Sequence, residues 1–392
     1  MSNTRVTINP ATVGLVDRFH FQYGVLGNTD ASTKATKTER ELSTFVDQFT
    51  LNREEASVLA PDGLTEVSGI EYEEARLSIF NMLFVWPFDE FSLGVSIDNQ
   101  RQIYGNGSFL DLNGDPLTGT ENETGASESF DYDTFSYLAG IAFKPFSLGI
   151  RYNIRTFNHN IKFLNPFALI NQTNPLSPAN FIGSIDILGT AEYVYLDYGI
   201  LFPNFLPKLD IGLTYRPSTT GTLKFDQNGL KDLPPGAVYK KRNFTEPALM
   251  LVGFGYIFEL GGTALQLLGD LGSYSETDEN AAGESGSNGN RAGGLIRFVW
   301  SPLIDISYGV QEETLAGLTY QNISTSLQFP IPFIDGYNLK LGTRTIKLTS
   351  EGSTIIDVTF ATFSFNLQFG ERRGRALEVP PKTKEIRFID RL

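Results

Sequence analysis

The sequence predicts an all-β protein, a transmembrane antiparallel β-barrel of about 14 strands within a range of roughly 12–16. Three features predict this fold: segments in which apolar and polar residues alternate, connections that are short and long in turn, and aromatic residues that recur at the short connections. The longest nearly apolar stretches, residues 77–88 and 248–258, are far shorter than the ~20 residues that a membrane-spanning helix needs. We therefore expect strands, rather than helices, to cross the membrane.

The alternation is clearest at the two ends of the expected barrel. In Thr12–Leu26, large apolar residues such as Phe19 and Phe21 fall on one face, and polar or small residues such as His20 and Gln22 fall on the other. The segment that ends at Phe369 repeats this pattern. Between these ends, the same period places strands near residues 75–87, 92–104, 134–144, 147–157, 187–202, 208–217, 245–258, 263–274, 291–300, 304–313, 318–329 and 337–349.

The connections between these segments predict which end of the barrel faces which compartment. Three polar inserts, residues 27–74, 105–133 and 275–290, hold 22 of the 45 acidic residues and only 4 of the 31 basic ones. We expect these inserts to be long extracellular loops, with the short turns in the periplasm. The net charge of −14 argues against a nucleic-acid partner, because nucleic-acid binding needs a basic surface.

Aromatic residues at the short turns predict one of the two membrane interfaces. Amphipathic rings are stable at the level of the lipid headgroups, so a ring of them indicates a girdle. The alternative is that they close the bottom of a soluble barrel. The residues concerned are Trp86, Phe88, Phe143, Phe146, Phe202, Phe205, Phe258, Trp300, Phe329, Phe333 and Phe369.

The expected organisation has three parts and places the protein in a bacterial outer membrane. Residues 1–11 form a short periplasmic segment, residues 12–369 form the barrel, and residues 370–392 form a periplasmic tail, so both termini are periplasmic. The tail lacks alternation and is either a disordered end or a docking peptide for a protein partner.

Three motifs resemble the FadL superfamily of outer-membrane transporters for hydrophobic compounds, which includes relatives of the secretion-system protein PorV. Asn9-Pro10-Ala11 is similar to the element before that family's first strand. Leu209–Asp226, which contains a Gly-x-x-Tyr-Arg strand, and the Gly-rich hairpin Pro247–Glu276 resemble two further segments of the family. The resemblance implies a barrel of about 14 strands that passes hydrophobic molecules.

The sequence departs from the family pattern before the Asn-Pro-Ala element. Family transporters carry an N-terminal hatch of some tens of residues there, whereas only Met1–Ile8 precede the element in this chain. We therefore expect the hatch to be reduced, removed or replaced by another segment.

No arrangement of residues predicts catalysis, a cofactor or a metal site. His20 and His159 are the only histidines, and neither lies in a pattern typical of a catalytic triad. Asp111–Asp115 has oxygen ligands at spacings that calcium uses, but a solvated turn is the preferred interpretation. We expect the protein not to be an enzyme.

The candidate ligand-binding residues are charged and apolar groups near one mouth of the barrel. Alternation points Arg151, Arg155 and Arg216 into the lumen, together with Arg18, Asp210, Asp305, Lys340 and Arg344. A guanidinium suits a carboxylate because it donates two parallel hydrogen bonds, although a salt-bridged barrel interior explains the same charges. The segment after the fifth strand is unusually apolar and supplies Phe163, Phe167 and Phe181 as candidate contacts for a ligand's hydrocarbon chain.

Two functions remain open from the sequence. The first is a FadL-like outer-membrane channel that binds or passes hydrophobic, fatty-acid-like small molecules, with membrane lipids as its surroundings. The second is a PorV-like or structural barrel that anchors a protein partner through residues 370–392.

Overall fold

The structure is a computed structural model that describes sixteen stretches of the chain. They are residues 9–27, 34–41, 56–58, 67–89, 91–111, 125–143, 145–164, 169–171, 184–225, 242–260, 263–275, 289–300, 304–315, 318–331, 337–350 and 353–369. The tail at residues 370–392 and most of the three acidic inserts lie outside the described residues.

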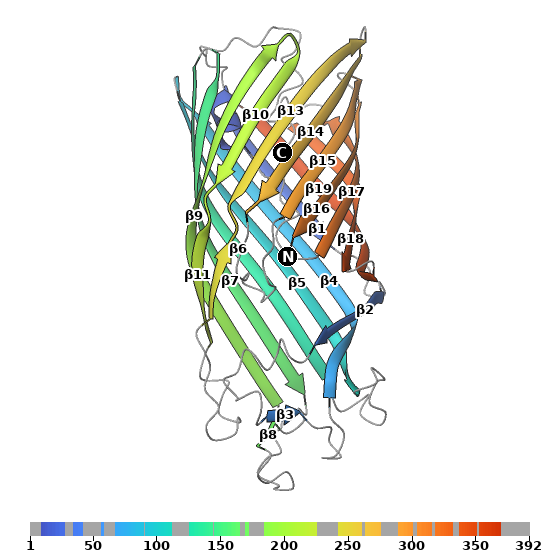
Figure 1. The fold of residues 1–392 in the computed structure, drawn as a ribbon. Coiled ribbons are helices and arrows are strands. Elements are labelled where there is room, and N and C mark those ends of the chain that lie inside the picture. The colour runs from blue at the N-terminus through green and yellow to red at the C-terminus, as the bar shows by residue number, and fades with distance from the viewer. Residues whose placement is uncertain are drawn as a thin grey trace.

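The described strands form a closed antiparallel barrel with fourteen strand positions, which confirms the fold expected from the alternation (Figure 1). The barrel closes where β1 pairs with β19, from Phe19 opposite Phe369 to Gly27 opposite Ala361. The barrel strands are β1 (Phe19–Gly27), β2 (Lys34–Glu41), β4 (Val67–Pro87), β5 (Phe91–Asp111), β6 (Gly125–Ala142), β7 (Ser147–Leu164), β9 (Ser184–Leu206), β10 (Leu209–Arg216), β11 (Thr219–Phe225), β12 (Arg242–Glu246), β13 (Leu249–Leu260), β14 (Thr263–Tyr274), β15 (Gly289–Trp300), β16 (Ile304–Leu315), β17 (Leu318–Pro330), β18 (Tyr337–Ser350) and β19 (Ser353–Phe369).

Three of the fourteen positions are occupied by two consecutive strands each: β1 with β2, β10 with β11, and β12 with β13. A separate pair, β3 (Ala56–Val58) and β8 (Leu169–Asn171), lies at the end of the barrel opposite the short turns (Figure 1). We call these two ends the short-turn end and the long-loop end.

The first half of the barrel is longer than the sequence pattern indicated. β4 and β5 each span 21 residues, and they pair from Pro87 opposite Ser92 to Val67 opposite Asp111. Parts of the inserts 27–74 and 105–133, expected as loops, are therefore strand. Alternation predicts a strand only where one face is apolar, and these extensions are rich in charged and polar residues on both faces.

The start of the first strand was also predicted wrongly. Residues Pro10–Leu15 form a short 3-10 helix, η1, and the strand begins only at Phe19. Proline supplies no backbone N–H, and its fixed φ suits the first turn of a helix. Val13 and Val16 are buried with Leu83, Val85 and Leu138 and do not face lipid.

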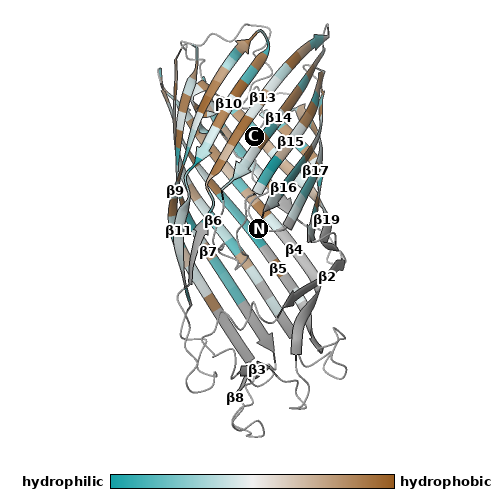
Figure 2. Ribbon diagram, in the orientation of Figure 1, coloured by the Kyte–Doolittle hydropathy of each residue, from teal (hydrophilic) through white to brown (hydrophobic). Residues whose placement is uncertain are grey.

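Exposed apolar side chains cover the outside of the barrel, and hydrophobic residues are concentrated in the half of the strands toward the short-turn end, a region that we call the apolar belt (Figure 2). In β5, Phe91, Leu93 and Ile97 are exposed, and on the same face Asn99 bonds to Asp133 on β6 beyond the belt. A belt of this kind on a closed barrel is typical of a transmembrane β-barrel. Within the described residues, no helix has the length or apolar character needed to cross a bilayer.

The expected aromatic girdle lies at the border of this belt. Several of the predicted rings are exposed at the short-turn end, namely Trp86, Phe88, Phe143, Phe205, Phe258, Trp300 and Phe369. Phe333 lies outside the described residues.

Candidate functional site

The N-terminal 3-10 helix η1 lies inside the barrel against a row of glycines. Gly140, Gly149 and Gly199 face inward on β6, β7 and β9, side by side across the wall. A Cβ atom built on Gly149 would lie 2.2 Å from the carbonyl carbon of Pro10, so only glycine permits this approach. The helix η1 therefore packs directly against this row of glycines.

Asn9 fixes the position of η1 through both ends of its side-chain amide. Its Nδ2 donates to the carbonyl oxygens of Ile200 on β9 and Leu213 on β10, at 3.0 Å each. Its Oδ1 accepts from the backbone N–H of Ala11, which caps the helix. The Asn-Pro-Ala motif thus anchors the chain to the wall from the inside.

A cavity of about 220 Å³ lies beside η1, against the inner wall formed by β10 and β13–β17. Leu251, Leu268 and Leu295 give it an apolar lining, and Asn9 and Thr12 border it. Glycines replace larger side chains at positions 212, 253, 293 and 309 of the wall, and the polar part of the lining includes the ion pair of Arg291 with Asp270, at 2.8 Å, and Gln311. The space suits a small apolar group.

A second cavity of about 250 Å³ adjoins the first, because both are lined by Leu295, Asn322 and Ser324. Its other walls are mainly polar and include Gln100, the cations Lys340 and Arg344, and several hydroxyl side chains. Nε of Arg344 donates to Oδ1 of Asn322 at 2.7 Å. The two cavities together give the lumen one apolar and one polar region.

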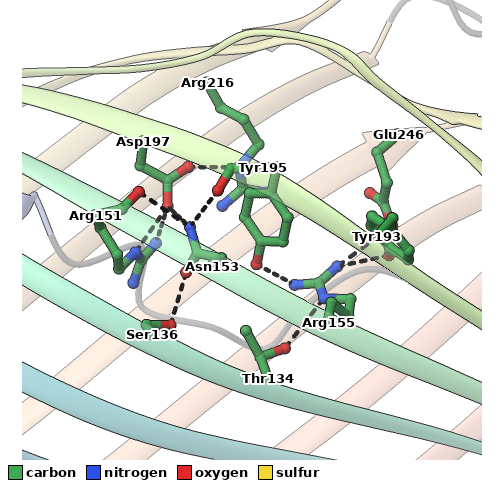
Figure 3. Close-up of polar contacts among 10 residues, drawn as sticks. All are labelled: Thr134, Ser136, Arg151, Asn153, Arg155, Tyr193, Tyr195, Asp197, Arg216 and Glu246. Atoms are coloured by element: carbon green, nitrogen blue, oxygen red, sulfur yellow. Dashed lines mark hydrogen bonds and ion pairs between the residues drawn. The ribbon is translucent and has the colours of Figure 1, made fainter.

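Asp197 is the centre of a buried ion cluster on the wall formed by β7, β9 and β10 (Figure 3). Its carboxylate is fully buried and accepts from Nε of Arg151 at 2.7 Å and from Nε of Arg216 at 2.6 Å. Asn153 donates to the same carboxylate at 3.1 Å and accepts from the hydroxyl of Ser136 at 2.7 Å. One carboxylate therefore holds two guanidiniums from neighbouring strands.

Arg155 is the centre of the adjacent cluster and is only 1% exposed. Its guanidinium donates to the hydroxyl of Tyr195 at 2.6 Å and to the carboxylate of Glu246 at 3.3 Å. The hydroxyl of Tyr193 also donates to Glu246, at 2.6 Å. The guanidinium of Arg216 lies over the ring of Tyr195 at 4.5 Å, which joins the two clusters.

The structure brings together three of the six candidate residues. Arg151, Arg155 and Arg216 converge as the alternation indicated, and all three are paired with carboxylates. Phe163 is in β7, but its side chain is not described, and Phe167 and Phe181 lie outside the described residues.

The sequence interpretation missed the partners of the three arginines. Asp197 interrupts an apolar strand, and Tyr193 and Tyr195 alternate with Val194 and Leu196 on that strand. Tyr193, Tyr195 and Asp197 are spaced two residues apart, and this spacing indicates that all three side chains lie on the same face of the strand. Glu246 gave no such signal, because it lies just before Pro247, where the strand period is broken.

Comparison with solved structures finds several proteins with a similar architecture. The toluene transporter TodX of P. putida superposes with a TM-score of 0.56 at 12% sequence identity, over 95% of each chain. The toluene transporter TbuX of Ralstonia pickettii gives 0.55 at 13% identity, over 93% of this chain and 92% of that one. A FadL homologue of Pseudomonas aeruginosa gives 0.54 at 10% identity, over 93% of each chain.

The chain has the FadL fold. At these identities the likeness concerns the fold alone. No protein-family model and no curated protein sequence matches the chain. The resemblance seen in the Asn-Pro-Ala element and the two later motifs therefore agrees with the architecture of the whole barrel.

Proposed function

We propose that this protein is an integral outer-membrane channel that binds hydrophobic small molecules in its lumen and passes them across the outer membrane. The observation that carries the proposal is the apolar cavity lined by Leu251, Leu268 and Leu295 inside a FadL-type barrel. The solved relatives with this fold include proteins described as toluene transporters, which supports an apolar cargo. As part of this proposal, the barrel is oriented so that the short turns and both chain ends face the periplasm.

The cargo class that we propose is a fatty-acid-like amphiphile. Each CH₂ group buried in the apolar cavity contributes about 0.8 kcal/mol to binding. The joined clusters contain three guanidiniums, of Arg151, Arg155 and Arg216, and two carboxylates, of Asp197 and Glu246. This leaves one positive charge in excess, which a single carboxylate headgroup would neutralise.

The cavity lies next to the ion clusters along β10 and β13. Thr214 and Leu251 line it, and two residues further along the same inward faces are Arg216 and Leu249. A ligand chain in the cavity therefore has its headgroup within reach of the excess charge.

The experiment that tests binding is a fluorescence titration of the purified barrel in lipid vesicles with cis-parinaric acid. Leu251→Trp places a large ring in the cavity, so we expect affinity to fall by about tenfold or more, since a filled core site does not accept further volume. Tyr215→Trp is the matched control, because this ring points outward and is 50% exposed. Absence of saturable binding by the unmodified barrel would overturn the channel proposal and favour the scaffold alternative.

The headgroup assignment is tested with the acid and its methyl ester. Arg216→Gln makes the cluster neutral, so it should weaken binding of the acid by roughly tenfold and leave the ester unchanged. Arg101→Gln, at an exposed ion pair on the outer face, should change neither. Equal losses for acid and ester would show that Arg216 shapes the cavity without binding the carboxylate.

A further inference from the structure

The inner faces of β16 and β17 carry polar side chains where the two cavities meet. Gln311 on β16 is the cross-strand partner of Asn322 on β17, and both side chains line the apolar cavity. Asn322 also lines the second, mainly polar cavity. We call Gln311 and Asn322 the amide pair. The amide pair lies at the boundary between the apolar and the polar region of the lumen.

The side-chain amide of Gln311 has hydrogen-bonding capacity that the described part of the protein does not use. Its Nε2 is buried, and no described residue accepts a hydrogen bond from it. Buried amide groups are bonded in the great majority of cases, because an unbonded donor costs free energy. A half-turn of the amide exchanges its N–H and oxygen ends, so either end can face the cavity. Gln311 therefore favours a ligand that supplies a hydrogen-bond partner.

Asn322 is held in one orientation, which directs its donors to one side. Its Oδ1 accepts from Nε of Arg344 at 2.7 Å, so its N–H end points away from that guanidinium. Asn153 on β7 shows a different case, because its amide donates to Asp197 at 3.1 Å and accepts from Ser136 at 2.7 Å. An amide with both ends bonded joins strands of the wall, whereas the donors of the amide pair lie beside a cavity.

A carboxylate lies on the other side of Gln311. Gly293 on β15 is the direct partner of Gln311, and Oδ1 of Asp270 on β14 occupies the space that a Cβ atom on Gly293 would fill. The other oxygen of Asp270, Oδ2, accepts from Nε of Arg291 at 2.8 Å. At this level the lining therefore combines N–H donors on β16 and β17 with a carboxylate acceptor on β14.

The neighbouring part of the lining is apolar or lacks a side chain. Leu268 and Leu295 are cross-strand partners on β14 and β15, and Gly309, the partner of Leu295 on β16, lies two residues before Gln311 on the same face. A hydrocarbon chain fits such a surface. A hydroxyl group on that chain matches the polar groups, because it accepts from an amide and donates to a carboxylate. A ketone oxygen accepts but does not donate, so it matches only the amides.

We propose that the amide pair, together with Asp270, is a specificity site for a hydroxyl group on the hydrocarbon chain of the cargo. The preferred ligands are then hydroxylated amphiphiles. An uncharged group fits better than a second carboxylate, because the amides are neutral and Arg291 already balances the charge of Asp270. The site rests on the proposed function, since it recognises the chain of a molecule that is bound in the same cavity.

The test measures displacement of cis-parinaric acid from the purified barrel in lipid vesicles. The competitors are stearic acid, a series of hydroxystearic acids in which the hydroxyl group is moved along the chain, and the corresponding keto acids. Gln311→Leu removes the amide at nearly constant volume. Gln321→Leu is the matched control, because Gln321 precedes Asn322 on β17 but points outward, where it donates to the exposed Glu312 at 2.8 Å.

At least one hydroxystearic acid should bind the unmodified barrel about threefold or more tightly than stearic acid or the matching keto acid. Gln311→Leu should lower the affinity for that isomer by about tenfold and leave the affinity for stearic acid unchanged, because a buried hydroxyl group without a partner loses its bonds to water. Gln321→Leu should keep the preference of the unmodified barrel.

Two outcomes overturn the hydroxyl site alone. In the first, the unmodified barrel binds stearic acid and prefers no hydroxylated isomer. In the second, Gln311→Leu leaves the preference for that isomer unchanged. Absence of saturable binding of every acid by the unmodified barrel instead overturns the proposed function and the hydroxyl site with it.

Discussion

At the scale of single residues, Asp197 is the most constrained group of the interior. It is fully buried and is bonded to Arg151, Asn153 and Arg216 on two neighbouring strands. A buried charge pair costs desolvation free energy, so its presence is weak evidence for stability by itself. Removing one partner is costly, however, because the other charges stay buried without compensation.

Asp197→Ala should therefore lower the free energy of unfolding by about 3–5 kcal/mol. The comparison is Arg101→Ala, whose ion pair with Asp131 lies on the outer face with the arginine 52% exposed. That change should cost at most about 1 kcal/mol, since exposed pairs are screened by solvent. Denaturant titration of both variants in lipid vesicles measures the difference. Similar small costs would show that water or another group compensates the two arginines.

At the scale of elements, η1 and the glycine row form one unit. The backbone of η1 approaches β6, β7 and β9 so closely that no Cβ fits at Gly149. Asn9 then ties the helix to β9 and β10. The position of η1 depends on these two features together.

Gly149→Ala should displace η1 and cost about 1–3 kcal/mol, because the added methyl group meets backbone atoms that have little freedom to move. Hydrogen exchange of the amides of residues 11–16 should rise in this variant. Gly253→Ala is the control, since its Cβ would meet nothing closer than 3.7 Å. Unchanged exchange in Gly149→Ala would mean that η1 is held by Asn9 alone.

The sequence was sufficient for the parts of the barrel where one face is apolar. Alternation placed Phe363 and Phe365 on the lipid face of β19 and pointed Arg151, Arg155 and Arg216 inward. It failed where both faces are polar, as in the extensions of β4 and β5. It also failed at η1, whose side chains alternate like a strand although Asn9 and Pro10 begin a helix.

The ion clusters could not be predicted from single strands. Glu246 and Arg155 are 91 residues apart, and their bond depends on the register of β7, β9, β11 and β12 around the wall. Register is set by packing and turn geometry across the whole sheet.

At the scale of the whole molecule, the barrel is organised as an apolar belt outside and a salt-bridged, partly hollow interior. Phe363 is 40% exposed on the belt, whereas the neighbouring Ser364 is only half-buried and lies on the opposite face of β19. This opposition of faces is what allows a chain with a mean hydropathy of −0.13 to cross a membrane.

Phe363→Arg should destabilise the barrel by about 2–4 kcal/mol if the site lies near the bilayer midplane, because the charge is transferred into hydrocarbon. Ser364→Arg should be far milder, since the lumen is polar. Folding titrations into vesicles measure both variants. Equal costs would mean that the assignment of inner and outer faces on β19 is wrong.

The central claim is that hydrophobic molecules pass through the lumen of this barrel, and uptake measures it most directly. Cells that lack their own outer-membrane fatty-acid transporter would express the chain, and the uptake rate of a labelled long-chain fatty acid would be followed. We expect the unmodified barrel and Tyr215→Trp to raise uptake well above background, and Leu251→Trp to return it to background because the ring fills the apolar cavity. Background uptake by the unmodified chain, with the folded barrel present in the outer membrane, would contradict the account.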